Sequence, residues 1–501
     1  MSTQPAISGF RPGTATRPYR PHPLQGRLAG VWAAVEREAL LAFLLALYAI
    51  IVLRVIPQEL VQDSWLTLVS GREVAEHGIP KTDSLTVWTK GVPWIDQQWL
   101  AQLIFYGAQF LGGFKLVMLL HAGALVTGLG IALAAARSLG ASVKSVALVG
   151  AVCMLLAPWA LAMRAQTLAI PLFVALIWLL ASDSRSPSRR VFLVLPLLAL
   201  WANIHGTVTL ACALVVLRGV TVALSRREGP KRLRATILIS LPFAALLASP
   251  YATELLGYYR TMLVSPALRT FISEWGPSTP SAMTALFYLV AFGTVALLAR
   301  YPSRLTVFEC LALLLTLAAG VTAIRSIIWF ALVALVLVPQ LLDGAISKSQ
   351  PRARHRGRAA LAAASAVALV VAFSVVATRP DSWFTAESPH AGGAAVAQFM
   401  DAHPQATVFA DDRYADWLLW EHPQLVGRIA YDIRFELFTL DQLNDLRAYR
   451  RVTGADWQAA ARDSTVVVFD PRDQSRAYTD AIESSDLAVV YRDPMIVVAA
   501  R

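Results

Sequence analysis

The sequence has few charged side chains and very few cysteines for its length. Of 501 residues, 15% are charged and only three are cysteines. Cys153, Cys212 and Cys310 all fall within apolar runs, and their spacing offers neither a disulfide framework nor a metal site. Hydrophobic residues make up 56% of the chain. This composition argues against an ordinary soluble protein.

What the sequence has in place of charge is a succession of long apolar runs. A helix needs roughly 20 apolar residues to cross about 30 Å of hydrocarbon. We therefore expect about eleven transmembrane helices, with the run at 190–204 the shortest. The expected spans are 39–56, 113–136, 144–162, 166–182, 190–204, 207–225, 235–249, 281–299, 304–320, 323–342 and 359–378.

Charge is distributed unevenly along the chain. Residues 1–379 carry 33 basic and 14 acidic side chains, whereas residues 380–501 carry 11 basic and 19 acidic ones. Short arginine clusters between apolar runs are typical of cytoplasmic loops, so no nucleic-acid partner is expected. The positive-inside rule then predicts a multi-pass protein of the cell inner (plasma) membrane. Its N-terminus would be cytoplasmic and its C-terminal domain extracytoplasmic.

The sequence divides into three parts. Residues 1–37 are predicted to be a disordered cytoplasmic tail. Residues 38–379 form the transmembrane domain, with long outer loops at 58–112 and 250–280. Residues 380–501 read as a small α/β domain without a glycine-rich phosphate fingerprint, so a dinucleotide or ATP site is unsupported. Its expected strands are 406–410, 428–432, 464–469, 487–491 and 495–500, the last two forming a hairpin.

The first outer loop holds the most informative polar residues. Helices are expected at 63–76 and 97–110, both lying flat at the membrane surface. Asp63 follows the first span closely, where a carboxylate can accept a proton from an acceptor hydroxyl or amine; alternatively it caps the helix. Asp83 and Asp96 are candidates for a second acid or for acceptor binding, although a turn role for Asp83 and a cap role for Asp96 are the default interpretation.

A second group of polar residues is expected at the outer face of the bundle. It consists of Arg164, Gln166, Asn203, His205 and Arg325. Polar groups near one leaflet are functional candidates, and arginine pairs bidentately with phosphate, so these residues suit an anionic lipid head. Alternatively, the two arginines reach out to ordinary lipid phosphates.

Two further charged residues have both a functional and a structural interpretation. Glu274 could be a second carboxylate facing the acceptor, or could pair with Arg269. Arg218, inside the sixth expected span, is expected to reach the cytoplasmic surface with its long side chain. No cofactor is expected, and a divalent metal is not supported.

Taken as a set, these features resemble the GT-C superfamily of polytopic glycosyltransferases, and more narrowly a widespread and largely uncharacterised bacterial branch of it. The resemblance covers about residues 39–470. It is carried by the segments QDSWLTLVSGREVAEHGIPKTDSLTVWTKGVPWIDQQWLAQL, MRAQTLAIPLF, LLALWANIHG, ISEWGP and VFADDRYADWLLWEHP.

The resemblance implies a sugar donor linked to polyprenyl phosphate and an extracytoplasmic acceptor: a cell-envelope glycan, lipid or protein. Asp63 would be the general base of an inverting transfer, and Arg164 and Arg325 would neutralise the departing lipid phosphate. Alternatives are a non-catalytic lipid-binding or assembly protein of the same fold, and a glycan polymerase or ligase. The C-terminal domain would position the acceptor or a partner.

Overall fold

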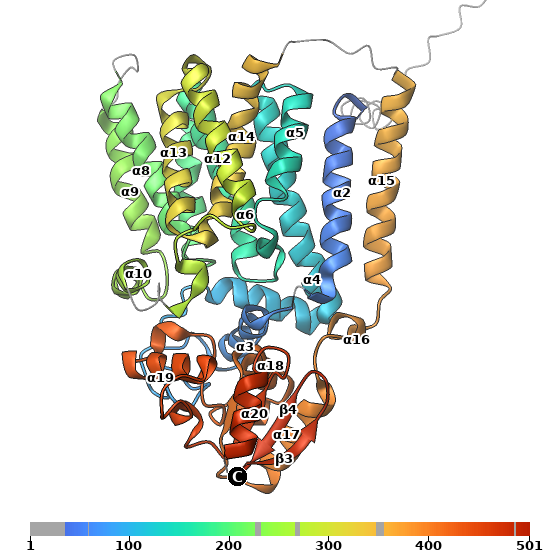
Figure 1. Cartoon of the computed structure of the whole chain (residues 1–501). Helices are drawn as coiled ribbons and strands as arrows, with labels where there is room; N and C mark the ends of the chain where they lie inside the picture. The colour runs from blue at the N-terminus through green and yellow to red at the C-terminus, as the bar shows by residue number, and fades with distance from the viewer. Residues whose placement is uncertain (1–35, 59, 226–231, 266–270, 347–354, 485–486) are drawn as a thin grey trace, which may run out of the picture.

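The computed structural model describes residues 36–58, 60–225, 232–265, 271–346, 355–484 and 487–501. The tail predicted to be disordered, 1–37, lies almost wholly outside the described residues. A bundle of helices stands on a smaller C-terminal domain, and the two outer loops lie at the end of the bundle that faces this domain (Figure 1).

Helices occupy all eleven positions at which the sequence predicts a span. They are α2 (Ala39–Val55), α4 (Trp99–Ser138), α5 (Val143–Cys153), α6 (Gln166–Arg185), α7 (Val194–Trp201), α8 (Val208–Leu224), α9 (Arg232–Leu246), α12 (Ala285–Arg300), α13 (Val307–Thr322), α14 (Ile327–Ala345) and α15 (His355–Ala377). By length and hydropathy, four helical segments of the described chain can cross a membrane: Trp99–Ser138, Gln166–Arg185, Ile324–Ala345 and Gly357–Ala377. The protein is therefore a multi-helix membrane protein, and the number of spans stays a prediction.

Short elements connect these helices at both ends of the bundle. Beneath the bundle lie α3 (Gln62–His77) and α10 (Glu254–Val264). The 3₁₀ turns are η1 (Ile56–Gln58), η2 (Pro158–Leu161), η3 (Arg189–Leu193), η4 (Ser273–Trp275), η5 (Pro302–Arg304) and η6 (Ile324–Ser326).

The predicted surface helix 97–110 is the first part of α4. The chain then bends at Gly112 and Gly113 and continues as a span. Gly113 has a φ of 64°, and a Cβ there would come within 2.5 Å of Asp381, so glycine is required at the bend. The bend lets one continuous helix lie beneath the bundle and then run through it (Figure 1).

The C-terminal domain is built on a four-stranded mixed sheet of order β1-β2-β4-β3, with β1 and β2 parallel. The strands are β1 (Val408–Ala410), β2 (Val466–Phe469), β3 (Ala488–Arg492) and β4 (Val497–Ala500). The helical elements are α16 (Asp381–Phe384), α17 (His390–Ala402), α18 (Asp412–Glu421), η7 (Pro423–Leu425), η8 (Phe435–Leu437), α19 (Leu440–Arg451), η9 (Ala459–Ala461) and α20 (Ser475–Ser484). The predicted hairpin of the last two strands is confirmed.

The prediction of a strand at 428–432 is wrong. Only Ile429 pairs there, with Val408 on one side and Thr86 of the first outer loop on the other. The chain then turns, because the Asp432 side chain accepts the backbone N–H of Arg434 at 2.9 Å and closes a local turn.

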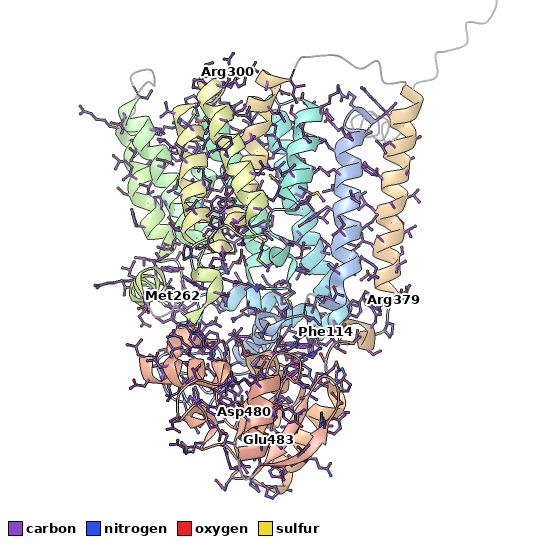
Figure 2. All side chains as sticks on the ribbon, in the orientation of Figure 1. Phe114, Met262, Arg300, Arg379, Asp480 and Glu483 are labelled. Atoms are coloured by element: carbon purple, nitrogen blue, oxygen red, sulfur yellow. The ribbon has the colours of Figure 1, made fainter. Side chains whose placement is uncertain are left out.

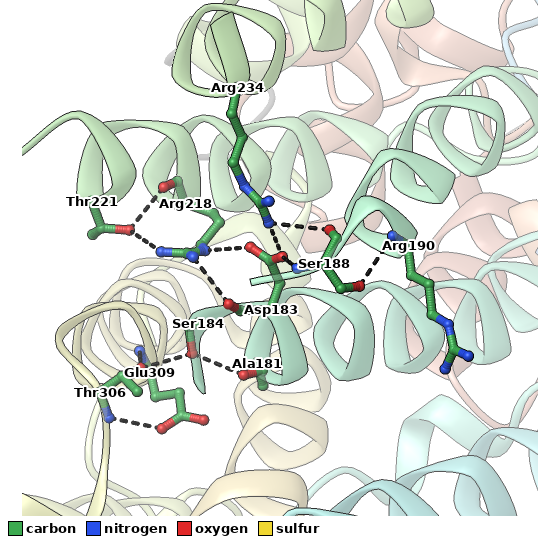
Figure 3. A network of polar contacts seen from close by, with 10 residues as sticks. All are labelled: Ala181, Asp183, Ser184, Ser188, Arg190, Arg218, Thr221, Arg234, Thr306 and Glu309. Atoms are coloured by element: carbon green, nitrogen blue, oxygen red, sulfur yellow. Dashed lines mark hydrogen bonds and ion pairs between the residues drawn. The ribbon is translucent and has the colours of Figure 1, made fainter. Parts of the chain in front are cut away.

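At the end of the bundle away from the C-terminal domain, a buried ion-pair network joins three helices (Figure 3). Asp183 of α6 accepts Arg218 Nε of α8 at 2.9 Å and also pairs with Arg234 of α9. The expectation that Arg218 reaches the surface is wrong, since its side chain is buried against this carboxylate. Arg300 marks the same end of the bundle, and Arg379 the opposite end (Figure 2).

Candidate functional site

Asp63 lies in the first turn of α3, where the partial positive charge of a helix N-terminus favours a carboxylate. It does not cap the helix, because the cap position is Val61. The next residue, Ser64, donates from Oγ to the carbonyl oxygen of Met163 at 2.6 Å. This bond joins two segments that are distant in sequence, and so sets Asp63 beside Arg164.

Arg164 contacts two carboxylates at once. Its Nε lies 2.9 Å from Asp63 Oδ2, and Nη1 and Nη2 donate to the two oxygens of Glu274 at 3.0 and 3.1 Å. Burial opposes ionisation, but the charges of Asp63 and Glu274 raise the pKa of Arg164 above its usual range. Against the effect of burial, Arg164 in turn lowers the pKa of Glu274. Arg164 is thus held as a fixed cation between two anions.

Arg325, in the turn η6 before α14, has a different kind of partner. Its guanidinium lies over the ring of Trp275, 4.2 Å from the ring centre. No carboxylate of the described residues lies within ion-pair distance of Arg325. Glu274 and Trp275 are neighbours in η4, so one turn of the second outer loop contacts both arginines.

A cavity of about 750 Å³ joins these residues where the bundle meets the C-terminal domain. Met262, one of its lining residues, is labelled in Figure 2 between the bundle and the C-terminal domain. The predicted site residues that line it are Asp63, Asp96, Arg164, Gln166, His205, Glu274 and Arg325. Two predicted residues, Asp83 and Asn203, are not among those that line it.

Asn203 uses its side chain to hold the fold together. Its Oδ1 accepts the indole N–H of Trp99 at 2.9 Å, and its Nδ2 donates to the carbonyls of Ala199 and Ala248. Three structural hydrogen bonds therefore engage this amide.

Asp83 is buried, and both of its carboxylate oxygens accept hydrogen bonds. It accepts the backbone N–H of Leu85, the hydroxyls of Thr86 and Thr89, and Arg434 Nη2 at 2.7 Å. Burial would raise its pKa, yet Arg434 and these hydrogen bonds lower it. Asp83 thus connects the first outer loop to the C-terminal domain.

Two titratable residues of the cavity are shifted towards their neutral forms. Burial, together with the charges of Arg325 and Arg164, lowers the pKa of His205 to about 3, and its Nδ1 lies 2.9 Å from Thr207 Oγ1. Burial raises the pKa of Asp96 to about 7. A neutral carboxyl and a neutral imidazole can each donate and accept hydrogen bonds to an uncharged ligand.

Part of the cavity wall comes from the C-terminal domain, which sequence reasoning did not place in the site. It consists of Asp412, Ile433, Arg434, Phe435, Glu436 and Arg450. The domain is held there by α18, which packs on α3: Arg72 of α3 donates to the carbonyls of Leu419 and Trp420 at the end of α18. No spacing in the sequence signals this contact.

The arrangement of helices, outer loops and terminal domain resembles that of a GT-C glycosyltransferase. ArnT from Cupriavidus metallidurans bound to undecaprenyl phosphate matches with a TM-score of 0.50 and 14% identity, over 95% of this chain and 98% of that one. The likeness shows the fold, and it confirms the GT-C-like fold predicted from the sequence.

Other comparisons add no further argument. The apo form of the same ArnT has a TM-score of 0.49 at 13% identity, over 95% of this chain and 98% of that one. A third structure is the archaeal oligosaccharyltransferase AglB from Archaeoglobus fulgidus in complex with an inhibitory peptide and a dolichol-phosphate. It has a TM-score of 0.49 at 11% identity, over 85% of this chain and 69% of that one. No protein-family model matches the sequence. No curated protein matches it either.

Proposed function

We propose that this protein is an inverting membrane glycosyltransferase that moves a sugar from a polyprenyl phosphate to an extracytoplasmic acceptor: a cell-envelope glycan, lipid or protein. The observation that carries the proposal is a single cavity in which Asp63, Arg164 and Arg325 lie together. The orientation deduced from the charge bias, with the cavity outside the cytoplasm, is part of the proposal.

In the proposed reaction, the acceptor oxygen or nitrogen attacks the anomeric carbon as its proton passes to the Asp63 carboxylate. The bond between the anomeric carbon and the phosphate oxygen breaks, and its electron pair leaves with the lipid phosphate. Arg325 and Arg164 stabilise the charge that develops on that phosphate. Attack from the side opposite the leaving group inverts the configuration at the anomeric carbon.

Two observations support a lipid phosphate as the ligand. Arg325 lines the cavity, and no carboxylate of the described residues neutralises its charge. It can therefore pair with a phosphate without first giving up a carboxylate partner. In addition, the solved structure of similar fold is described as bound to undecaprenyl phosphate.

The proposal is tested with the purified full-length protein in lipid nanodiscs. A panel of polyprenyl-phosphate sugars is supplied with envelope extract as acceptor, and the release of free polyprenyl phosphate is measured. We expect release with at least one donor, and only when acceptor is present. Binding of bare polyprenyl phosphate without release from any donor would contradict catalysis and favour the non-catalytic relative. Failure to bind it at all would contradict the proposed ligand.

A further inference from the structure

Five buried polar atoms of the cavity wall have neither a hydrogen-bond partner nor an ion-pair partner within the described part of the chain. They are Asp96 Oδ2, Gln97 Oε1, Gln102 Oε1, Tyr259 Oη and Arg434 Nη1. Their side chains belong to residues that are at most 6% exposed. Buried polar groups are nearly always paired, so the partners of these atoms must come from the cavity, as water or as a ligand that displaces it.

These atoms belong to one continuous polar wall. Gly206 brings Gln97 and Tyr259 together, since a Cβ built there would lie 3.7 Å from the Gln97 amide carbon and 3.6 Å from the Tyr259 ring. Gln97 adjoins Asp96 in sequence, and Gln102 follows in the first turn of α4. The wall therefore runs from α10 through the first outer loop to the start of α4.

The C-terminal domain completes this wall. Arg434 uses Nε on Asp432 at 2.8 Å and Nη2 on Asp83 at 2.7 Å, and its guanidinium covers the Trp94 ring at 4.3 Å. These contacts fix the guanidinium while Nη1 stays unpaired. Glu436 follows two residues later and is close enough to Asp96 for its charge to add to the raised pKa of that carboxyl.

Asp96 and Glu436 differ from the other acids of the cavity. Among the residues that the structure describes, neither forms an ion pair, whereas Asp63 and Glu274 both pair with Arg164. Burial raises the pKa of each to about 7. Both acids are therefore largely uncharged at slightly acid pH, which disfavours a metal ion as their ligand and suits a neutral polar one.

We infer that this polar wall, made by Asp96, Gln97, Gln102, Tyr259, Arg434 and Glu436, binds the hydroxyl groups of a sugar. A sugar presents several hydroxyls in a small volume, and each of them both donates and accepts. They match the mixture of unpaired acceptors on α4 and its preceding loop and unpaired donors on Tyr259 and Arg434. The inference rests on the proposed function and assigns the C-terminal domain a direct part in sugar selection.

The sugar could be the one carried by the donor or one belonging to the acceptor, and two binding measurements distinguish these sources. The first compares the affinity of the protein in nanodiscs for a polyprenyl-phosphate sugar with its affinity for bare polyprenyl phosphate. The second measures binding of a panel of methyl glycosides by saturation-transfer NMR, with and without polyprenyl phosphate. Neither measurement requires turnover, so a failure of catalysis leaves both informative.

The test variant is Glu436→Gln, which keeps the shape of a half-buried side chain, and Asp96→Asn provides a second position. The matched control is Glu483→Gln on α20, at the far side of the C-terminal domain (Figure 2). We expect each test variant to weaken sugar-dependent binding about ten-fold, because the amide NH2 that replaces one carboxyl oxygen can no longer accept a hydrogen bond from a sugar hydroxyl. Bare polyprenyl phosphate should bind all variants equally, which also shows that they fold.

The outcomes distinguish a donor sugar from an acceptor sugar. Loss of the extra affinity for the sugar-linked lipid assigns the wall to the donor sugar, and loss of the methyl-glycoside signal on lipid-loaded protein assigns it to the acceptor sugar. Sugar binding that both test variants retain at the level of the control would overturn the inference. So would a wild-type protein that neither binds a methyl glycoside nor prefers the sugar-linked lipid to the bare lipid. Failure of the wild type to bind bare polyprenyl phosphate would contradict the proposed function, but not the inference about sugar binding.

Discussion

Arg164 Nε lies 2.9 Å from Asp63 Oδ2, although the two residues are far apart in the sequence. The contact fixes the side chain of the proposed base at the wall of the cavity. It also sets the base next to a cation that the proposed phosphate would approach. The same guanidinium holds Glu274 with its other two nitrogens, so ligand binding must rearrange at least one of these pairs.

Arg325 should be the principal phosphate contact. Replacing Arg325 with Ala removes a cation that lies over the Trp275 ring and pairs with no carboxylate of the described residues, and charge-assisted bonds to phosphate are among the stronger ones. We expect the affinity for polyprenyl phosphate to fall about ten-fold to a hundred-fold in a nanodisc binding assay. Arg260→Ala, an exposed arginine of α10 outside the cavity, is the matched control. Equal affinities in the two variants would contradict this role.

Glu274 should compete with the phosphate for Arg164. Its two oxygens occupy Nη1 and Nη2 in the forked geometry that a phosphate also uses. Glu274→Gln removes the competing charge, so polyprenyl phosphate should bind several-fold tighter, on the order of ten-fold at low salt. Glu254→Gln, at the start of α10 and outside the cavity, should leave the affinity unchanged. A weaker affinity for Glu274→Gln would show that Glu274 supports the ligand instead of excluding it.

The sequence predicted one part of the site and missed the other for a physical reason. Asp63, Arg164 and Arg325 each stand beside an apolar run, and a polar residue at such a boundary can be placed at one face of a bundle from hydropathy alone. Arg434 and Glu436 reach the same cavity only because the C-terminal domain docks on α3. That docking depends on contacts such as Arg72 with Leu419, which leave no periodic signal.

The pairing of Glu274 was likewise beyond the sequence. The expected alternative partner, Arg269, lies outside the described residues, whereas Arg164 is far away along the chain. Similarly, hydropathy placed Asn203 and His205 together at the outer face. Only side-chain packing separates them, with His205 lining the cavity and Asn203 bonded to Trp99 behind it.

Arg434 should hold the C-terminal domain on the bundle. Its buried pair with Asp83 crosses between the domain and the first outer loop. Removing one partner of a buried ion pair strands the other, which typically costs about 3–5 kcal/mol. Arg434→Ala should therefore lower the unfolding temperature and expose the domain to limited proteolysis. The control is Arg462→Ala, which breaks an exposed pair with Asp456 in the same domain and should change little. Equal protease resistance in the two variants would contradict the role of Arg434 in holding the domain on the bundle.

Asp96 should make stability depend on pH. Its pKa is raised to about 7 in the folded protein from an ordinary value near 4, so ionisation is harder in the folded state. The contribution of Asp96 to stability is therefore greatest below about pH 4 and declines as the pH rises from there to about 7. Asp96→Asn does not titrate, so it should melt above the wild type at pH 8, by a few degrees. At pH 4.5 the difference should be much smaller. A difference independent of pH would contradict a raised pKa.

The most direct test of the proposed function compares sugar transfer and lipid binding in the wild type, in Asp63→Asn and in the control Asp480→Asn on α20. A general base contributes about 10²–10⁴-fold to the rate, so transfer by Asp63→Asn should fall by at least a hundred-fold. Its affinity for polyprenyl phosphate should persist or increase, because Arg164 loses a competing carboxylate. Transfer at the wild-type rate by Asp63→Asn would contradict the assignment of the base. Loss of lipid binding together with transfer would show that Asp63 only holds the cavity in shape.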